Sequence, residues 1–338
     1  YDDNASIKET KEMLKDRLTT LNNLLNRHMH QAVATGSNYN LWLKNTQPFH
    51  WLAEFYQIIK GNGGFDVIIG NPPYVEFRSN DNVYGGLTYE TKSTCNLHAL
   101  CVERSKRILN SKSTFGMILP IGAFSTQNMI PLMNFIKTHS NQLWVSFYHF
   151  RPARLFDGGK GASIPTTIFI SATKGNQQVF STKANKFTPD TRSYLFNNLK
   201  YSLYQDGLPS QINFCIPKIS HFIENSIYNK ISNNSPLAII KKQVTTNQSI
   251  SYRTAGGLYW KIVINFDFPY ESTSNKKSFL SSEVNAKVVT AFLNSSLQWV
   301  ICTSTFDTLN FKDYYIFSLP FFCSGVNPLI YYFVPSLE

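Results

Sequence analysis

Four consecutive residues, Asn71-Pro72-Pro73-Tyr74, carry the groups that chemistry on an NH2 nitrogen requires. The lone pair of an aromatic exocyclic amine or a carboxamide is delocalised, so the nitrogen is a poor nucleophile. The Asn71 carboxamide oxygen and the Pro72 carbonyl can each accept one N–H of the target, while proline rings add no competing donors. Tyr74 would stack on a base rotated out of a duplex. We predict that these four residues are catalytic; the alternative is a strand-ending turn.

The segment before this tetrad is expected to be a buried strand that delivers it. Val67, Ile68 and Ile69 are consecutive β-branched residues, which suit a parallel strand covered on both faces, and Gly70 with two prolines ends the strand. Ligands bind at the carboxyl ends of strands in open α/β sheets. The sequence therefore predicts that the tetrad lies at such an edge.

Several segments around the tetrad resemble the large type IIG restriction-modification methylases of the gamma class. They are residues 47–55, 63–66, 95–100, 115–120 and 151–157, and they fall in that family's order. The resemblance covers residues 7–175. It implies DNA adenine-N6 methylation with S-adenosylmethionine as methyl donor, within a restriction-modification or phage-defence protein. Type IIG relatives usually carry a nuclease domain at the amino end, and that region is not in this chain.

The resemblance also implies roles for residues after the tetrad. Phe156 matches the aromatic residue that in TaqI-like members stacks on the target adenine opposite the tyrosine, and base–aromatic stacking contributes about 1–3 kcal/mol. The alternative is that Phe156 fills space between two strands. Arg151, Arg154 and Lys160 are expected to meet DNA phosphates, although Arg154 has Asp157 as an alternative partner.

The cofactor-binding motifs of the family are not found before the tetrad. Family members hold the cofactor with a glycine-rich turn after the first strand and acidic residues after the second and third. The glycine-rich residues 61–64 precede the expected strand and are interpreted as a turn. We expect a carboxyl-terminal fragment that is inactive alone, with weak or no S-adenosylmethionine binding through a partial pocket containing Asp66 and Asn71.

These observations predict an α/β fold, the C-terminal half of a Rossmann-like methyltransferase sheet, followed by an α+β target-recognition domain. Leucines recurring at helical spacing make residues 1–60 a helical spacer packing on the catalytic domain. Residues 61–175 form the partial catalytic domain and residues 176–338 the target-recognition domain. With no earlier strands, the strand before the tetrad becomes a sheet edge, which predicts either a homodimer through that edge or its coverage by the amino-terminal helix.

Within residues 61–175, further elements follow from the pattern. Helices are expected at 96–110 and 127–138, and strands at 114–119, 143–150 and 166–172. Residues 75–94 are expected to form an active-site loop. The last two strands should form an antiparallel pair at the sheet edge.

Residues 252–260, 292–297 and 311–315 resemble the TaqI-like target-recognition domain. Arg253 in this part is a candidate for reading a base, because arginine recognises guanine with two hydrogen bonds; a structural role is the alternative.

Composition agrees with a soluble, cytoplasmic protein that binds double-stranded DNA. The net charge of +11 favours a polyanionic partner, and 43% hydrophobic residues among 338 suffice for two cores. Five cysteines without paired metal spacing predict no metal site, and no membrane span is expected. Two other functions are left open, a DNA-recognition module without catalysis and a protein glutamine methyltransferase, because a carboxamide poses the same nitrogen problem.

Overall fold

The computed structural model describes the chain in ten stretches. They are residues 2–34, 36–78, 88–156, 164–205, 208, 212–232, 236–255, 262–307, 311–319 and 321. Lys160, Asp157, residues 256–260 and part of the expected loop at 75–94 lie outside them.

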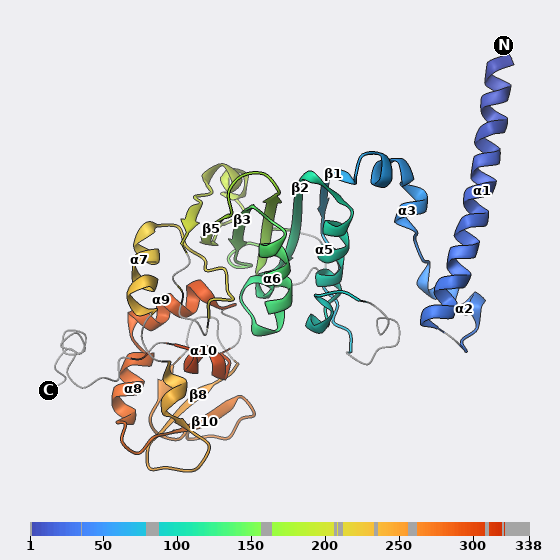
Figure 1. Ribbon diagram of the computed structural model, residues 1–338. Helices are drawn as coiled ribbons and strands as arrows, with labels where there is room; N and C mark the ends of the chain where they lie inside the picture. Colours follow the sequence, from blue (N-terminus) through green and yellow to red (C-terminus); the bar gives the residue numbers. More distant parts are fainter. Residues whose placement is uncertain are drawn as a thin grey trace.

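A six-stranded mixed sheet forms the centre of the molecule (Figure 1). Its strands, in spatial order, are β1 (Phe65–Gly70), β2 (Leu109–Pro120), β4 (Thr166–Ala172), β3 (Gln142–Tyr148), β5 (Gln178–Asn185) and β6 (Ser202–Tyr204). β1 runs parallel to β2, and β3 runs parallel to β5. β4 is antiparallel to both β2 and β3, so β1, β2, β3 and β5 all point the same way.

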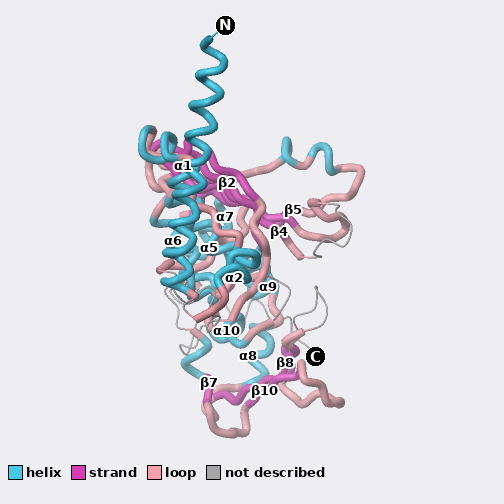
Figure 2. Tube along the Cα trace, turned by 90° about the vertical axis from the view of Figure 1, so that its right-hand side faces the viewer, coloured by secondary structure: helices cyan, strands magenta, loops and turns pink. Residues whose placement is uncertain are grey.

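Two helices cover one face of this sheet (Figure 1, Figure 2). They are α5 (Leu97–Arg107) and α6 (Ile130–Thr138), and the latter follows the short turn η4 (Gln127–Met129). On β2 the alternate residues Phe115, Met117 and Leu119 are buried, as the period of a strand requires. The mixed α/β fold and the positions predicted for these helices and strands are confirmed.

The sheet extends further than the sequence predicted. β3 and β4 do form an antiparallel pair, with Val145 opposite Phe169. Their expected position at the sheet edge is wrong, because β5 pairs with β3 and β6 pairs with β5. Gly175, with a φ of 89°, lies between β4 and β5, in a left-handed conformation that glycine adopts without strain. The sheet therefore continues past residue 175.

β1 is the outer strand at the opposite end of the sheet, and it is paired with β2 alone among the described strands. Coverage on both faces, as predicted, is wrong: the side chains of Val67 and Ile69 are 59% and 80% exposed, while Ile68 packs on the core. Ile170 on β4 is also exposed on the face away from α5 and α6, beside Gly116. Among the described helices, none covers this part of the sheet, and an apolar surface is left bare.

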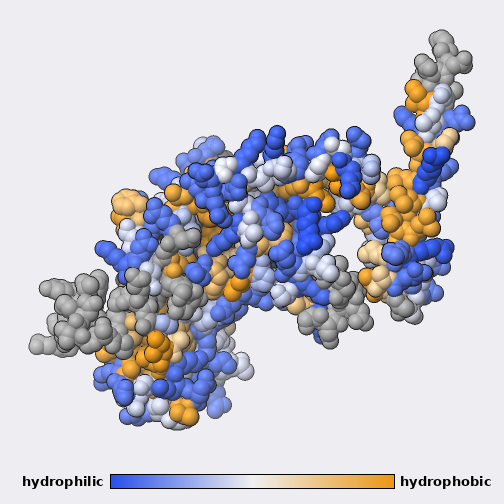
Figure 3. Space-filling model, in the orientation of Figure 1, coloured by the Kyte–Doolittle hydropathy of each residue, from blue (hydrophilic) through white to orange (hydrophobic). Residues whose placement is uncertain are grey.

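The amino-terminal segment is helical, as predicted. It consists of α1 (Asp2–Val33), α2 (Tyr39–Thr46), α3 (Trp51–Glu54) and the π-helical turn η1 (Gln57–Gly61). The His50 ring and Asn26 are joined at 2.7 Å, Asn22 donates to Glu54 at 2.7 Å, and the His30 and Tyr39 rings lie 5.3 Å apart, so α1 packs against both α2 and α3. Apolar side chains gather on the surface of α1 (Figure 3). None of the helices described is both long and apolar enough to cross a bilayer.

α1 lies far from β1 (Figure 1). Coverage of the β1 edge by this helix, one of the two predicted outcomes, is therefore wrong. The segment instead reaches the sheet through aromatic rings, because Trp51 and Phe55 contact Phe65 at centroid distances of 6.2 and 5.3 Å.

The carboxyl-terminal part is built from a second sheet and short helices. The sheet has the order β7 (Lys241–Lys242), β10 (Asn275–Leu280), β8 (Ser249–Arg253), β9 (Val263–Ile264). The helices are α7 (Phe222–Ile231), α8 (Ala286–Leu293), α9 (Ser296–Thr305) and α10 (Asp313–Phe317). One cluster of buried apolar residues includes Phe147 of β3, Ile301 of α9 and Tyr315 of α10. The two parts of the chain therefore share a core.

Candidate active site

The tetrad follows β1 directly, at the carboxyl edge of the sheet. Gly70, the last residue of β1, lies opposite Met117 of β2, and a Cβ at Gly70 would come within 3.0 Å of the Met117 sulfur. Glycine therefore permits the close strand approach that precedes the tetrad. Asn71 is exposed and Pro72 is buried, so the loop is anchored while the Asn71 carboxamide is open to a ligand.

Backbone hydrogen bonds hold the residues after the tetrad against the start of α5. Leu97 N donates to the Val75 carbonyl at 2.9 Å, and Phe77 N donates to the Cys95 carbonyl at 2.9 Å. These two bonds fix the chain on the far side of Tyr74. The tetrad is thus held by β1 on one side and by α5 on the other.

Tyr74 is half-buried beside His98 of α5. The ring centroids are 6.0 Å apart with an interplanar angle of 81°. Burial raises the pKa of Tyr74 to about 12 and lowers the pKa of His98 to about 4, so both rings are neutral near pH 7. His98 is only 2% exposed, and neither of its ring nitrogens has a hydrogen-bond partner. The sequence analysis gave His98 no role. Its position within residues 95–100, one of the segments that resemble the methylase family, was the signal that could have indicated one.

A buried carboxylate fixes the segment that leads into α5, a feature that sequence reasoning missed. Glu103 accepts hydrogen bonds from Thr91 N at 2.8 Å, Thr91 Oγ1 at 2.8 Å and Glu90 N at 3.1 Å, and it pairs with Arg107. Burial raises the pKa of Glu103, but the Thr91 and Glu90 bonds and the Arg107 charge outweigh it, and the pKa falls below its usual range. The carboxylate therefore stays charged and orders residues 90–94.

The residues predicted to meet the base and phosphates follow β3. Because β3 is parallel to β1, this segment leaves the sheet at the same edge as Asn71, three strand spacings or about 14 Å away. Phe156 is 52% exposed, whereas its neighbour Leu155 is buried, so Phe156 does not fill the space between strands. Arg151 is exposed and lies over the Phe150 ring at 5.4 Å. Arg154 is exposed, and its carbonyl accepts a hydrogen bond from Arg192.

Asp66 and Asn71, the two residues assigned to a partial cofactor pocket, are not brought together. Asp66 lies at the amino end of β1, where its carboxylate accepts a hydrogen bond from Asn110 Nδ2 at 2.6 Å. Asn71 is five residue steps further along the extended chain, a distance of about 16 Å. Only Asn71 lies at the carboxyl edge.

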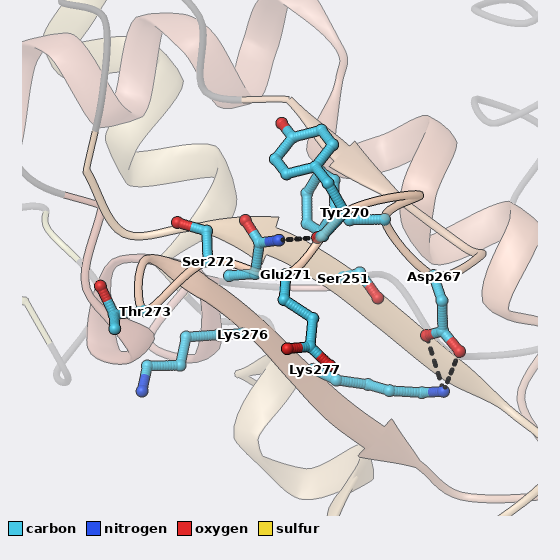
Figure 4. Close-up of a pocket in the computed structure, with 10 residues that line it drawn as sticks. Ser251, Asp267, Tyr270, Glu271, Ser272, Thr273, Lys276 and Lys277 are labelled. Carbon is cyan, nitrogen blue, oxygen red and sulfur yellow. Dashed lines mark hydrogen bonds and ion pairs between the residues drawn. The ribbon is translucent and has the colours of Figure 1, made fainter.

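Arg253, the candidate base reader, lies at the end of β8 and is already engaged within the chain. Its guanidinium donates to the Tyr270 hydroxyl at 2.8 Å and lies 5.6 Å from the centre of that ring. Beside it, an open pocket of about 610 Å³ has both acidic and basic walls (Figure 4). There Lys277 and Asp267 form an ion pair at 2.7 Å, while Lys276 and Glu271 also line the pocket.

The residues around Asn71 give a partial fit to S-adenosylmethionine. The two unpartnered nitrogens of buried His98, next to Tyr74, would be satisfied by a polar group bound there. Asn71 and Tyr74 would form one wall of such a site, and the remaining walls would have to face the open side of β1.

Comparison with known proteins gives one family match. Residues 5–156 match the family described as Eco57I restriction-modification methylase. This range includes the tetrad, His98 and the segment from Arg151 to Phe156. No curated protein matches the chain.

Solved structures of restriction-modification enzymes show a distant likeness. A nuclease-deletion mutant of the Type ISP enzyme LlaGI in complex with a DNA substrate mimic has 15% identity and a TM-score of 0.38. The match covers 63% of this chain and 20% of that one. The type I methyltransferase subunit from Streptococcus thermophilus has 14% identity and a TM-score of 0.28, covering 40% of this chain and 31% of that one. The type IIG restriction endonuclease BpuSI has 13% identity and a TM-score of 0.29, covering 56% and 24%. The chain thus spans about a fifth of the length of the LlaGI protein.

Proposed function

We propose that the protein takes part in site-specific methylation of adenine N6 in DNA, because residues 5–156 match the Eco57I restriction-modification methylase family. The observation that carries the proposal is the position of the tetrad. Its exposed Asn71 stands at the carboxyl edge of β1, and Tyr74 is held beside α5, within the matched residues.

The proposed chemistry assigns one task to each residue of the site. The Asn71 carboxamide oxygen and the Pro72 carbonyl accept the two N–H groups of the target amine, which localises its lone pair for attack. Neither proline has an N–H that would compete for these acceptors. S-adenosylmethionine, when bound, supplies the electrophilic methyl group.

The aromatic residues of the site would hold the base. Tyr74 is neutral near pH 7, with a pKa of about 12, and offers its ring to the rotated adenine. Phe156, exposed on a segment that starts at the same edge, would supply the opposite face. Arg151, Arg154 and Lys160 would contact phosphates of double-stranded DNA.

Residues 1–60, 61–175 and 176–338 are proposed to act as spacer, catalytic domain and target-recognition domain. β5 and β6 lie after residue 176 but belong to the first sheet. The target-recognition domain, residues 176–338, would therefore begin with strands of the same sheet that carries the tetrad. Arg253 would read a base only if it leaves the Tyr270 hydroxyl or keeps donors available beside it.

A DNA-binding module without catalysis is the second candidate. The observation that favours it is the bare side of β1, where Val67 and Ile69 are exposed and a complete cofactor pocket would need further walls. A glutamine methyltransferase is a third candidate for the same tetrad. The three candidate functions differ in their product: methylated adenine, methylated glutamine, or no methylated product.

The test is methyl transfer by the full-length protein with S-adenosylmethionine and DNA of mixed sequence, with methylated nucleosides measured by mass spectrometry. We expect N6-methyladenine, and we expect Asn71→Ala to reduce its formation by about 100- to 1000-fold, the usual effect of removing one hydrogen-bonding group from a reacting centre. Asn62→Ala, in the exposed turn before β1, is the matched control and should keep full activity.

Each alternative has its own outcome in this assay. DNA binding without any methylated nucleoside would favour the binding module. Methylated glutamine in a protein substrate, with no methylated nucleoside, would favour the third candidate.

A further inference from the structure

A second site stands at the same edge of the sheet as Asn71. β1, β3 and β5 point the same way, so the residues after them, Asn71, His149 and Lys186, emerge at one edge. β5 lies four strand spacings from β1, or about 19 Å. A DNA strand, with one phosphate per 3.4 Å of helix axis, would have several phosphates over this distance.

The site is a cleft of about 300 Å³ between the sheet and the carboxyl-terminal helices. β5 and the residue after it contribute Lys183 and Lys186, and α9 contributes Trp299 and Thr303. Figure 1 shows α7 and α9 at the β5 end of the sheet. We call this space the β5–α9 cleft. Its walls come from both parts of the chain, which share one core, so the groups that line it are held in fixed relation.

Lys218 supplies a fixed positive charge to the β5–α9 cleft. It is 3% exposed, and its Nζ donates to the carbonyls of Ser304 at 3.1 Å and Phe306 at 2.7 Å. These carbonyls close the end of α9, where the helix dipole is negative and favours a cation. Burial lowers the pKa of Lys218 to about 8, so the amine is still mostly charged at pH 7.

The other ionisable groups of the cleft leave this charge in excess. Burial lowers the pKa of His149 to about 4, and the positive charges of Lys186 and Lys218 add to that lowering. The one acidic group that lines the cleft is Glu224, whose carboxylate accepts from Ser220 N at 2.7 Å and His221 N at 3.0 Å at the start of α7. The buried carboxylate of Asp307 lies near enough to Lys218 to act on its pKa in the opposite direction to burial. Three lysines thus stand against two carboxylates, of which Glu224 already has partners, and the remaining positive charge attracts an anion.

We propose that the β5–α9 cleft binds a backbone phosphate of the DNA whose base enters the site at Asn71. The proposal rests on the proposed function for the identity of the anion. Lys183 and Lys186 contact the phosphate, and the indole of Trp299, 40% exposed, lies against the adjoining sugar. Because the contact is to the backbone, it carries no sequence information and sets the position of the duplex on the sheet edge.

The experiment compares the salt dependence of DNA binding by three proteins. One is the unmodified protein, the second carries Lys183→Ala with Lys186→Ala, and the third carries Lys112→Ala with Lys174→Ala. The control lysines are also exposed, but they lie at the opposite edge, near the start of β2 and just after β4. Both double variants lose the same charge. Binding of a mixed-sequence duplex is measured between 50 and 200 mM salt, about the range over which phosphate contacts are lost.

We expect the cleft variant to reduce the slope of log K against log salt by about 1, since the one phosphate contact that it loses contributes about 0.9. The control variant should reduce it by much less. Equal slopes for the two variants, or an unchanged slope for the cleft variant, would overturn the proposal while leaving DNA as the partner. An unmodified protein that does not bind DNA would overturn the proposed function together with it.

Discussion

β1 and β2 are neighbouring parallel strands, and the two faces of the sheet that they form differ in packing. Ile68 of β1 lies opposite Phe115 of β2, on the face that α5 and α6 cover, and both contribute to the core. On the other face Ile69 lies opposite Gly116 and is 80% exposed. The tetrad thus follows a strand whose carboxyl-terminal half is packed on one face only.

The comparison shows that the position of the site depends on one face of β1, the face that carries Ile68. Backbone pairing with β2 and the Ile68 face together fix the direction in which Asn71 leaves the sheet. The Val67 and Ile69 face contributes little to this and remains free for contact with another structure. Three predictions test this division, in order of decreasing effect.

The largest effect is expected on the packed face. Phe115 is 1% exposed and packs on Phe169 at a centroid distance of 5.4 Å, so Phe115→Ala would leave a cavity in the core. We expect a loss of about 3–5 kcal/mol in the free energy of unfolding, measured by urea titration. A loss below 1 kcal/mol would mean that the packed face of the sheet is not the one that stabilises it.

Most elements of the first sheet could be predicted from the sequence because their signals are local. Runs of β-branched residues that end at a proline or glycine predicted β1, β2 and β4, and the residue types of the tetrad indicated chemistry on an NH2 nitrogen. The bare face of β1 could not be predicted, since three adjacent β-branched residues look the same whether one or both faces are covered. The partners of β5 and β6 also depend on contacts with strands distant in the sequence.

The candidate site shows the same limit. The tetrad is one short string, whereas the Glu103 network needs Thr91, which precedes α5, and Arg107, at the end of α5, both brought to the Glu103 carboxylate. The β5–α9 cleft joins residues from His149 to Ser304, which no periodicity relates. Arg253 was chosen for its chemistry, and its bond to the Tyr270 hydroxyl appears only in the folded chain.

An intermediate effect is expected from pH, through His98 behind the tetrad. Its pKa in the folded chain is about 4 because of burial, below the ordinary value of 6.5. Between these values the unfolded chain binds a proton that the folded chain does not, so stability falls as pH falls. We expect His98 to account for a loss of about 2 kcal/mol between pH 7 and pH 5.

The measurement is urea unfolding at both pH values for the unmodified protein and His98→Gln. The variant should lose less stability on acidification, by about the same 2 kcal/mol. Some pH dependence should persist because the pKa of His149 is also lowered to about 4. Identical pH dependence in the two proteins would show that His98 is solvated, which would contradict its burial beside Tyr74.

The smallest effect is expected on the bare face, and its size decides what that face does. Ile69→Ala removes a side chain that is already 80% exposed, so a monomeric chain should lose no more than about 0.5 kcal/mol. The homodimer proposed through β1 predicts otherwise, because Ile69 would then be buried at an interface and the loss would approach that of a core residue. Urea unfolding at several protein concentrations, with sedimentation to give the oligomeric state, separates the two cases. A small, concentration-independent loss in a monomer would leave the face free for contact with another structure, whereas a large loss that shrinks on dilution, as the dimer dissociates, would place a second copy of the chain against β1.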